Sequence, residues 1–416
     1  MTASLISDAA DTRREIRREV LTALGLSTGA ALALGLSRFA YGLLLPPMRA
    51  DLGWTYVEAG ALNTANGAGY IVGALVAAWA ARRWGTVPAF LAGFAVSVMV
   101  LLLSAATASL SVLIALRTVG GVSTALTFIL GAGLTAAICP AQDPRRRGAL
   151  VCLYVAGVSL GILFAGVAIP IILQDGVQRW PAGWVALGLM GAAGLPAAAW
   201  AARNVPAPVG GSSAVLNFRQ LRQMAPTIVG YTLFGAGYVG YMTYIVALLQ
   251  KQGGSSEQVF WFWLVLGLVS AVSTVLWGRV LGAFHGGRGP ALVFATAMLG
   301  ALPVLVFPGP PAMFVSAILF GGSFLAGPAS ITIVAQRQLP AASWTAAISL
   351  LTVGFAFGQT VSPVLAGAIS DATGSIAAGF WVSPILLGLA ACANLLQRPP
   401  ASDETPAIVT REEKIQ

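Results

Sequence analysis

The chain has 416 residues, of which 57% are hydrophobic and only 9% are charged, and its formal net charge is +9. Because charged residues at this low frequency cannot cover the surface of a water-soluble protein of this length, the composition excludes an ordinary soluble domain. The basic charges fall between hydrophobic runs and therefore do not point to nucleic acid. The apolar excess predicts an all-α integral membrane protein whose partner is the lipid bilayer.

Twelve apolar runs are each long enough to cross a bilayer as a helix, which takes about 20 residues. Residues 1–19, which precede the first run, are expected to be a cytoplasmic leader, because that run is too long for a cleavable signal peptide. Pro46-Pro47 is expected to end the first span. In chain order the runs lie near residues 21–45, 57–81, 87–108, 110–138, 149–173, 182–202, 225–249, 258–282, 289–307, 311–336, 343–370 and 375–396.

Lysine and arginine are distributed unevenly between the loops. Most of the 23 lie in segments on the side of the N-terminus, whereas only Arg49, Arg179 and Lys251 lie in the opposite loops. Because cytoplasmic loops carry the excess of positive charge, both termini are predicted to be cytoplasmic.

The longest internal polar segment, residues 203–224, is predicted to be a central cytoplasmic loop. It separates a six-helix bundle over 20–202 from a second over 225–396, followed by a cytoplasmic tail over 397–416. The fifth span carries Gly157-x-x-x-Gly161, and the eleventh carries the same spacing, GFAFG, over 354–358. These echoes predict two bundles related by pseudo-twofold symmetry, as in many secondary transporters.

Several motifs resemble those of the major facilitator superfamily. The sequence AARRWGT (80–86) is similar to its loop motif at Arg83 and Gly85, and Arg117-x-x-x-Gly121 is similar to its fourth-helix motif. GVSLGILFAG (157–166) resembles its antiporter glycine motif but lacks the Gly-Pro pair. The stretches SRFAYGLLLPPM, TANGAGYIVGAL, LVLGLVSAVSTVLWGR and SPVLAGAISDATGS resemble the bacterial YbfB/YjiJ-type branch.

This resemblance implies a multi-pass transporter of the bacterial inner membrane that works by alternating access. It also implies that spans one, four, seven and ten line a central cavity. Gating or loop-motif roles follow for Arg83, Gly85, Gly157 and Gly161.

No pattern of catalytic or metal-ligating residues is present, so neither an enzyme, a cofactor nor a metal is predicted. None of the 14 acidic residues lies deep in a span, where a proton carrier would be expected. Glu58, at the outer mouth of the second span, is the candidate for proton coupling. The alternative is that it only begins its helix, where acidic residues are favoured.

Two arginines lie inside predicted spans. Arg38 and Arg117 are each about seven residues, or ~10 Å, from the outer end of their helix. Since burying an arginine at the bilayer centre costs roughly 3 kcal/mol, something must offset its charge. Water, backbone carbonyls, an ion pair between Arg38 and Glu58, or an anionic substrate are the alternatives.

Helical spacing places Tyr41 on the same face as Arg38 and directs Phe39 elsewhere. The second span offers amides and a hydroxyl to a polar solute, and the seventh and eleventh offer tyrosines and a glutamine. For Tyr241, a place in the interfacial aromatic belt remains an alternative. The predicted substrate-binding residues are Arg38, Tyr41, Asn63, Asn66, Tyr70, Arg117, Tyr238, Tyr241 and Gln359.

The sequence therefore favours a monomeric secondary transporter of a small organic solute, with an organic anion such as a carboxylate preferred. The alternative is an efflux transporter for amphiphilic compounds or drugs. A membrane sensor without transport is the third hypothesis and has the least support, because the chain has no large soluble domain. The proton is retained as a coupling ion to be tested.

Overall fold

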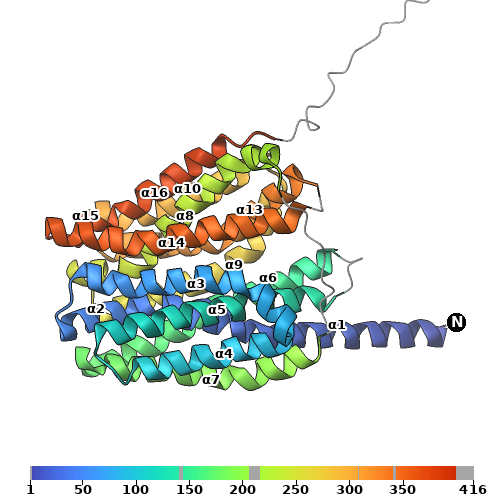
Figure 1. Cartoon of the computed structure of the whole chain (residues 1–416), viewed down its shortest axis with the longest axis horizontal. Helices are drawn as coiled ribbons and strands as arrows, with labels where there is room; N and C mark the ends of the chain where they lie inside the picture. The colour runs from blue at the N-terminus through green and yellow to red at the C-terminus, as the bar shows by residue number, and fades with distance from the viewer. Residues whose placement is uncertain (1, 140–143, 206–215, 308, 341–342, 400–416) are drawn as a thin grey trace, which may run out of the picture.

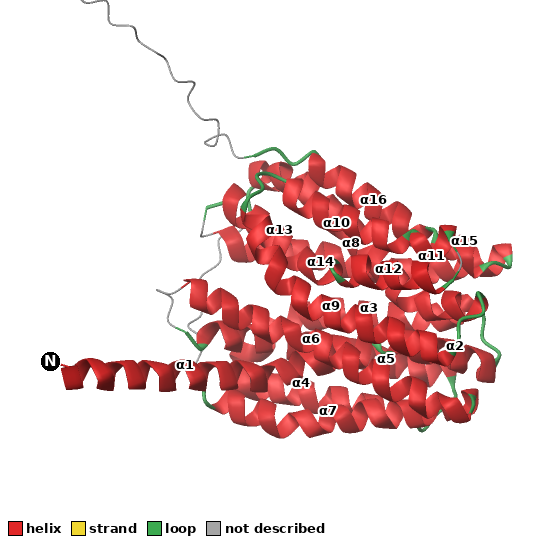
Figure 2. Cartoon of the chain, turned by 180° about the vertical axis from the view of Figure 1, so that it is seen from behind, coloured by secondary structure: helices red, strands yellow, loops and turns green. Residues whose placement is uncertain are grey.

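The computed structural model describes residues 2–139, 144–205, 216–307, 309–340 and 343–399. Twelve candidate spans in it are long and apolar enough to cross a membrane, as predicted, so the chain is a multi-pass membrane protein. The described residues form helices joined by short loops and contain no strand (Figure 2). The helices gather into two bundles that lie side by side along their length (Figure 1).

The first bundle begins with three consecutive elements that together make one span. These are α1, a π-helix labelled η1, and α2. The elements of this bundle are α1 (Thr2–Ala30), η1 (Ala31–Phe39), α2 (Tyr41–Leu52), α3 (Tyr56–Trp84), α4 (Thr86–Ser104), α5 (Leu110–Ala137), α6 (Pro144–Ile172), η2 (Leu173–Asp175), η3 (Val177–Arg179) and α7 (Trp180–Arg203).

The second bundle contains several spans that are broken into shorter helices. Its elements are α8 (Phe218–Lys251), α9 (Ser256–Gly282), α10 (Arg288–Ala301), α11 (Pro303–Val306), α12 (Pro310–Gly321), η4 (Phe324–Ala326), α13 (Gly327–Gln338), α14 (Trp344–Thr373), α15 (Ile376–Phe380) and α16 (Val382–Leu395).

Two predicted helix boundaries are wrong. Pro46 and Pro47 lie inside α2, which ends instead at Leu52 and is capped by Gly53, whose φ of 68° favours glycine. Helix α8 begins seven residues earlier than predicted, because Asn217 and Gln220 form a capping box with bonds of 2.9 and 3.0 Å. Residues 206–215 of the predicted central loop and 400–416 of the predicted tail lie outside the described residues.

The glycine motifs of the two bundles pack in the same way. A Cβ added at Gly161 of α6 would lie 2.5 Å from the carbonyl oxygen of Ala31, so the fifth span touches the backbone of the first. A Cβ at Gly358 of α14 would lie 2.0 Å from the carbonyl oxygen of Thr232, so the eleventh span touches the seventh. This equivalence is what a pseudo-twofold relation between the bundles requires.

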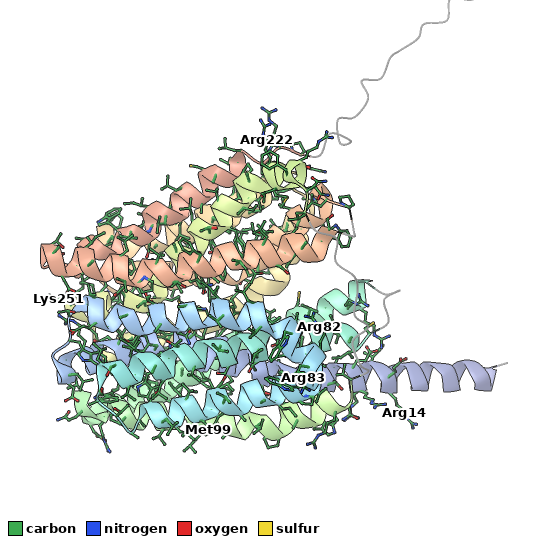
Figure 3. The ribbon with its side chains drawn as sticks, viewed as in Figure 1. Arg14, Arg82, Arg83, Met99, Arg222 and Lys251 are labelled. Atoms are coloured by element: carbon green, nitrogen blue, oxygen red, sulfur yellow. The ribbon has the colours of Figure 1, made fainter. Side chains whose placement is uncertain are left out.

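The two ends of the molecule differ in charge and in how the bundles meet. Arg82, Arg83 and Arg222 lie at what we call the arginine-rich end, and Lys251 lies at the opposite, Lys251 end (Figure 3). In the described residues, the hydrogen bonds between the bundles lie in the middle of the molecule or toward the Lys251 end. They include Asn63 to Thr243 at 2.7 Å and Thr64 to the carbonyl of Thr360 at 2.7 Å.

An aspartate of the second bundle closes the Lys251 end. The carboxylate of Asp371 in α14 accepts hydrogen bonds from the backbone N–H groups of Tyr56 and Val57, at 2.9 and 2.8 Å. These N–H groups begin α3, where the helix dipole favours an anion. Tyr244 adds bonds from its hydroxyl to the carbonyls of Tyr56 and Pro363, at 2.9 and 2.7 Å. Asp371 therefore holds the bundles together as a cap supplied from across the interface.

Replacing Asp371 by Asn should favour separation of the bundles at the Lys251 end. A charged cap at a helix N-terminus contributes about 1 kcal/mol, which corresponds to roughly fivefold in population. Spin labels on cysteines placed at the exposed residues Val177 and Lys251, after the native cysteines have been replaced, would measure the distance distribution.

Asp175→Asn is the matched control, because this acid lies at the same end but pairs with Arg179 of its own loop at 2.9 Å. If both variants gave the wild-type distribution, Asp371 would have no role in closing this end.

Candidate functional site

Arg117 lies at the centre of the first bundle. It is fully buried, and its Nη1 donates a hydrogen bond of 2.7 Å to the carbonyl of Ser37. Its guanidinium carbon lies 5.3 Å from the ring centre of Tyr41 and 5.5 Å from that of Trp184, within the range of cation–π attraction. Its Nε and Nη2 have no hydrogen-bond partner among the described residues.

Arg38 lies in the π-helix η1, which interrupts the first span. Only 2% of its surface is exposed, and its guanidinium carbon lies 5.5 Å from the ring centre of Tyr70. Its Nε and Nη2 also have no partner in the described part of the chain. Single turns of π-helix inside α-helices occur frequently at functional sites.

Close packing explains where the π-helix forms. A Cβ at Gly35 would lie 2.6 Å from the Cα of Gly161, so only glycine fits between η1 and α6. The N–H of Ala40 bonds to the carbonyl of Gly35, five residues before it, at 3.0 Å. In this segment, where the i to i−4 pattern is broken, the carbonyl of Ser37 accepts the hydrogen bond from Arg117.

The two arginines interact electrostatically with one another. The ion pair between Arg38 and Glu58 that was one alternative is not formed, because the Glu58 carboxylate accepts bonds from the N–H and hydroxyl of Thr55 at 2.9 and 3.1 Å. Glu58 thus belongs to the capping box that begins α3, the other interpretation of this residue. The positive charge of the pair is not offset by a carboxylate within the described residues.

The second bundle contributes a polar pair opposite Arg38. The hydroxyl of Tyr238 donates a 2.8 Å hydrogen bond to Oε1 of Gln359, and both side chains are buried. The Nε2 of Gln359 has no partner among the described residues. Tyr238 interacts electrostatically with both Arg38 and Tyr70, so the pair belongs to the same cluster as the arginines.

Aromatic rings surround Tyr238. Phe355 and Phe234 stack on it at 5.3 and 5.4 Å, and Phe324 at 6.3 Å. Phe39 of the first bundle meets it edge-on at 6.1 Å. The prediction that Phe39 points away from the site is wrong, because its ring meets Tyr238 of the second bundle, a contact that spacing along one helix cannot show.

Of the remaining predicted residues, two lie beside Arg117 and two lie elsewhere. Asn66 donates to the carbonyl of Arg117 at 3.3 Å and Tyr41 donates to that of Ala59 at 2.6 Å, so both lie beside Arg117. Asn63 instead bonds Thr243 across the interface. Tyr241 is fully buried within the second bundle, where it bonds Ser316 at 2.6 Å, so its interpretation as an interfacial belt residue is wrong.

The predicted motif residues lie away from this cluster. Arg83 is exposed at the end of α3, and Gly85 follows with a φ of 91° that favours glycine. Gly157 packs against the carbonyl of Ser27 inside the first bundle. No group of three or more His, Cys, Asp or Glu that could hold a metal ion occurs in the described residues.

Sequence reasoning missed the partners of the arginines and of Tyr238. The Ser37 carbonyl, Trp184 and the phenylalanines around Tyr238 carry no sequence signal, because apolar residues of this kind occur throughout the spans. Asp371 could have been found as an acidic residue that ends a predicted span. Nothing in the sequence, however, indicated that it caps another helix.

A comparison with known families identifies the chain. The model described as "Uncharacterised MFS-type transporter YbfB" matches residues 30–395. The chain belongs to this family of the major facilitator superfamily. The predicted superfamily and branch are therefore confirmed.

A relative from Streptomyces lividans, described as a chloramphenicol resistance protein, is 26% identical over 359 residues, which cover 81% of this chain and 87% of the relative. Among solved structures, an inward-facing, occupied bacterial homologue of the lysosomal transporter Spinster matches with a TM-score of 0.73 and 17% identity, over 94% and 99% of the two chains. A D-xylose–proton symporter matches with a TM-score of 0.68 and 16% identity, over 92% and 97%. These structures confirm the transporter fold.

Replacing Gly35 by Ala should push η1, which carries Arg38, away from α6. The added methyl group meets the backbone of α6, and overpacking of this kind costs about 1–3 kcal/mol. We expect a lower unfolding temperature and weaker binding of any substrate that contacts Arg38. The matched control is Gly133→Ala in α5 of the same bundle, where nothing lies within 4 Å of the new Cβ. Equal thermal shifts for the two variants would contradict the packing argument.

Proposed function

We propose that the protein is a secondary transporter of a small organic anion, such as a carboxylate, that works by alternating access. The observation that carries this proposal is the pair of buried arginines with unpaired N–H groups, beside which the described residues place no acid. A planar guanidinium fits a carboxylate through two parallel hydrogen bonds and cannot discharge itself by losing its proton. A carboxylate held between Arg38 and Arg117 offsets one of their two positive charges and accepts hydrogen bonds from their unpaired N–H groups.

The second bundle supports an anion that has an apolar part. Tyr238 and Gln359 supply a hydroxyl and an amide to orient a polar group, and Gln359 has a free amide N–H. The stacked rings around Tyr238 supply an apolar wall opposite the arginines. We therefore propose a carboxylate on a planar or aromatic body as the preferred substrate, with Asn66, Tyr41 and Tyr70 supporting the arginines.

The positive-inside rule suggests the orientation. We propose that the arginine-rich end faces the cytoplasm of a bacterial cell, that both termini are cytoplasmic, and that the protein is a monomer in the inner membrane. With the bundles joined at the Lys251 end, this state is then inward-facing, in keeping with its similarity to the inward-facing Spinster homologue.

The proton is the coupling ion that we propose. Glu58 is retained as the candidate, because its carboxylate accepts the bonds of the capping box at the N-terminus of α3, and protonation weakens those bonds. Asp371 caps the same helix N-terminus. The solved relatives include a proton symporter, so the fold accommodates such coupling.

Arg38→Gln should weaken binding of an organic anion by about 10–100-fold, since a hydrogen bond to a charged group contributes about 1.5–3 kcal/mol. The measurement is a ligand-induced thermal shift of the purified protein, because a bound ligand raises the unfolding temperature. The probes are aromatic carboxylates, each paired with its uncharged primary amide. Wild-type protein should respond to acids and not to amides.

Arg82→Gln is the control, because it removes an exposed arginine outside the site. A wild-type response from Arg38→Gln toward every acid that binds would overturn the proposed role of the arginine.

A second candidate function is efflux of amphiphilic compounds or drugs. The relative named as a chloramphenicol resistance protein favours it, as do the stacked rings around Tyr238. Expression in a sensitive strain should then raise tolerance to chloramphenicol, which is uncharged. In that case Phe355→Ala should reduce tolerance severalfold while Arg38→Gln leaves it unchanged. Unchanged tolerance on expression of the wild-type protein would count against this second candidate.

A further inference from the structure

A second basic site lies at the arginine-rich end of the second bundle, away from the central cluster. It is a cavity of about 550 Å³ formed where α8 begins and where α13 and α16 end. Arg219 and Arg222 of α8 and Arg398 after α16 line it, together with Gln223 and Gln338. Arg222 points outward at this end, on the side of the second bundle that is far from the first (Figure 3).

Among the residues that the structure describes, no acid lines this cavity. The lining residues include three arginines. The ion pairs found in the described residues involve Arg146 and Arg179, which lie elsewhere. Three like charges in one cavity repel one another, so an anion that enters it is attracted by all three.

Buried and part-buried hydrogen bonds hold the wall of the cavity in place. Gln223 donates to the side-chain oxygen of Gln338 at 2.8 Å, and Gln338 donates in turn to the carbonyl of Arg398. Thr227 donates to the side-chain oxygen of Gln397 at 2.8 Å. Gln338 and Gln397 are only 8% and 5% exposed. The arginines therefore belong to a wall whose backbone and side chains are fixed by hydrogen bonds.

Large apolar side chains are exposed directly beside the arginines. Phe218 and Leu221, which flank Arg219 on the first turns of α8, are 79% and 40% exposed, and Leu396 of the cavity wall is 72% exposed. In a membrane protein, such residues at a helix end are covered by lipid chains. Exposed apolar side chains next to arginines at a helix end suit the boundary between hydrocarbon and headgroups, with the arginines on the headgroup side.

From this arrangement we propose that the cavity binds the phosphate headgroup of an anionic phospholipid. The arginines match the phosphate oxygens through paired hydrogen bonds, and Phe218 and Leu396 contact the acyl chains. Basic pockets between spans at a membrane surface are suited to such headgroups. The proposal does not depend on the substrate of the central site.

Native mass spectrometry of the full-length protein, incubated with equal amounts of phosphatidylglycerol and phosphatidylcholine, tests it. Wild-type protein should retain phosphatidylglycerol selectively. The triple variant Arg219→Gln/Arg222→Gln/Arg398→Gln should bind it roughly 100-fold more weakly, because each arginine near the surface contributes to the attraction. A triple Arg→Lys variant keeps the charge and should recover part of the binding.

The matched control replaces Arg82, Arg83 and Arg203, which are exposed at the same end of the first bundle, by Gln and should leave lipid binding unchanged. An unfolding temperature like that of the wild type shows that each variant is folded. Equal retention of the two lipids, or equal losses in the two triple Gln variants, would overturn the proposal. A thermal shift with inorganic phosphate alone, lost only in the cavity variant, would overturn it in favour of a free-phosphate site.

Discussion

The candidate site at the centre of this molecule is defined by two positive charges that are buried without a carboxylate beside them in the described residues. Arg38 and Arg117 are almost fully enclosed, and each retains two nitrogen atoms without a partner among the described residues. An unpaired polar group in such a place costs about 1–3 kcal/mol, and more when it is charged. The Ser37 carbonyl and the rings of Tyr41, Tyr70 and Trp184 offset part of this cost. The unpaired N–H groups that remain are the donors that an anion would use, and they are the basis of the proposed selectivity.

The local backbone is what makes this arrangement possible. Glycine at 35 lets η1 of the first span touch α6. The Ser37 carbonyl of the same π-helix accepts the hydrogen bond of Arg117 from a different span, and Phe39 at the end of this π-helix meets Tyr238 of the second bundle. One short segment of π-helix therefore contributes to both the polar and the apolar side of the candidate site.

The sequence predicted the large features because they depend on length, apolar content and charge. The twelve spans follow from properties averaged over many residues, the family follows from its motifs, and the arginines were recognised because charge inside a span is rare. The sequence could not predict which way a side chain points from an irregular helix, or which residues of the two bundles come into contact. Glu58 and Asp371 show the difference: both are acids at the ends of spans, yet one caps its own helix and the other caps a helix of the opposite bundle. Only the packing of α3 against α14 distinguishes them.

The contacts that join the bundles also differ in kind from those that define the site. In the middle of the molecule and toward the Lys251 end, the bundles meet through hydroxyl and carboxylate bonds to backbone groups and through the bond from the Asn63 amide to the Thr243 hydroxyl. Each has a net contribution of about 1 kcal/mol. Water replaces such bonds at little cost when the end opens. The arginines, by contrast, are held within the first bundle by contacts that rocking of one bundle against the other leaves intact, while Tyr238 and Gln359 move with the second. In this scheme a bound anion that touches both bundles adds an interaction that exists only when they are close. This links occupancy of the site to the transition between the two states.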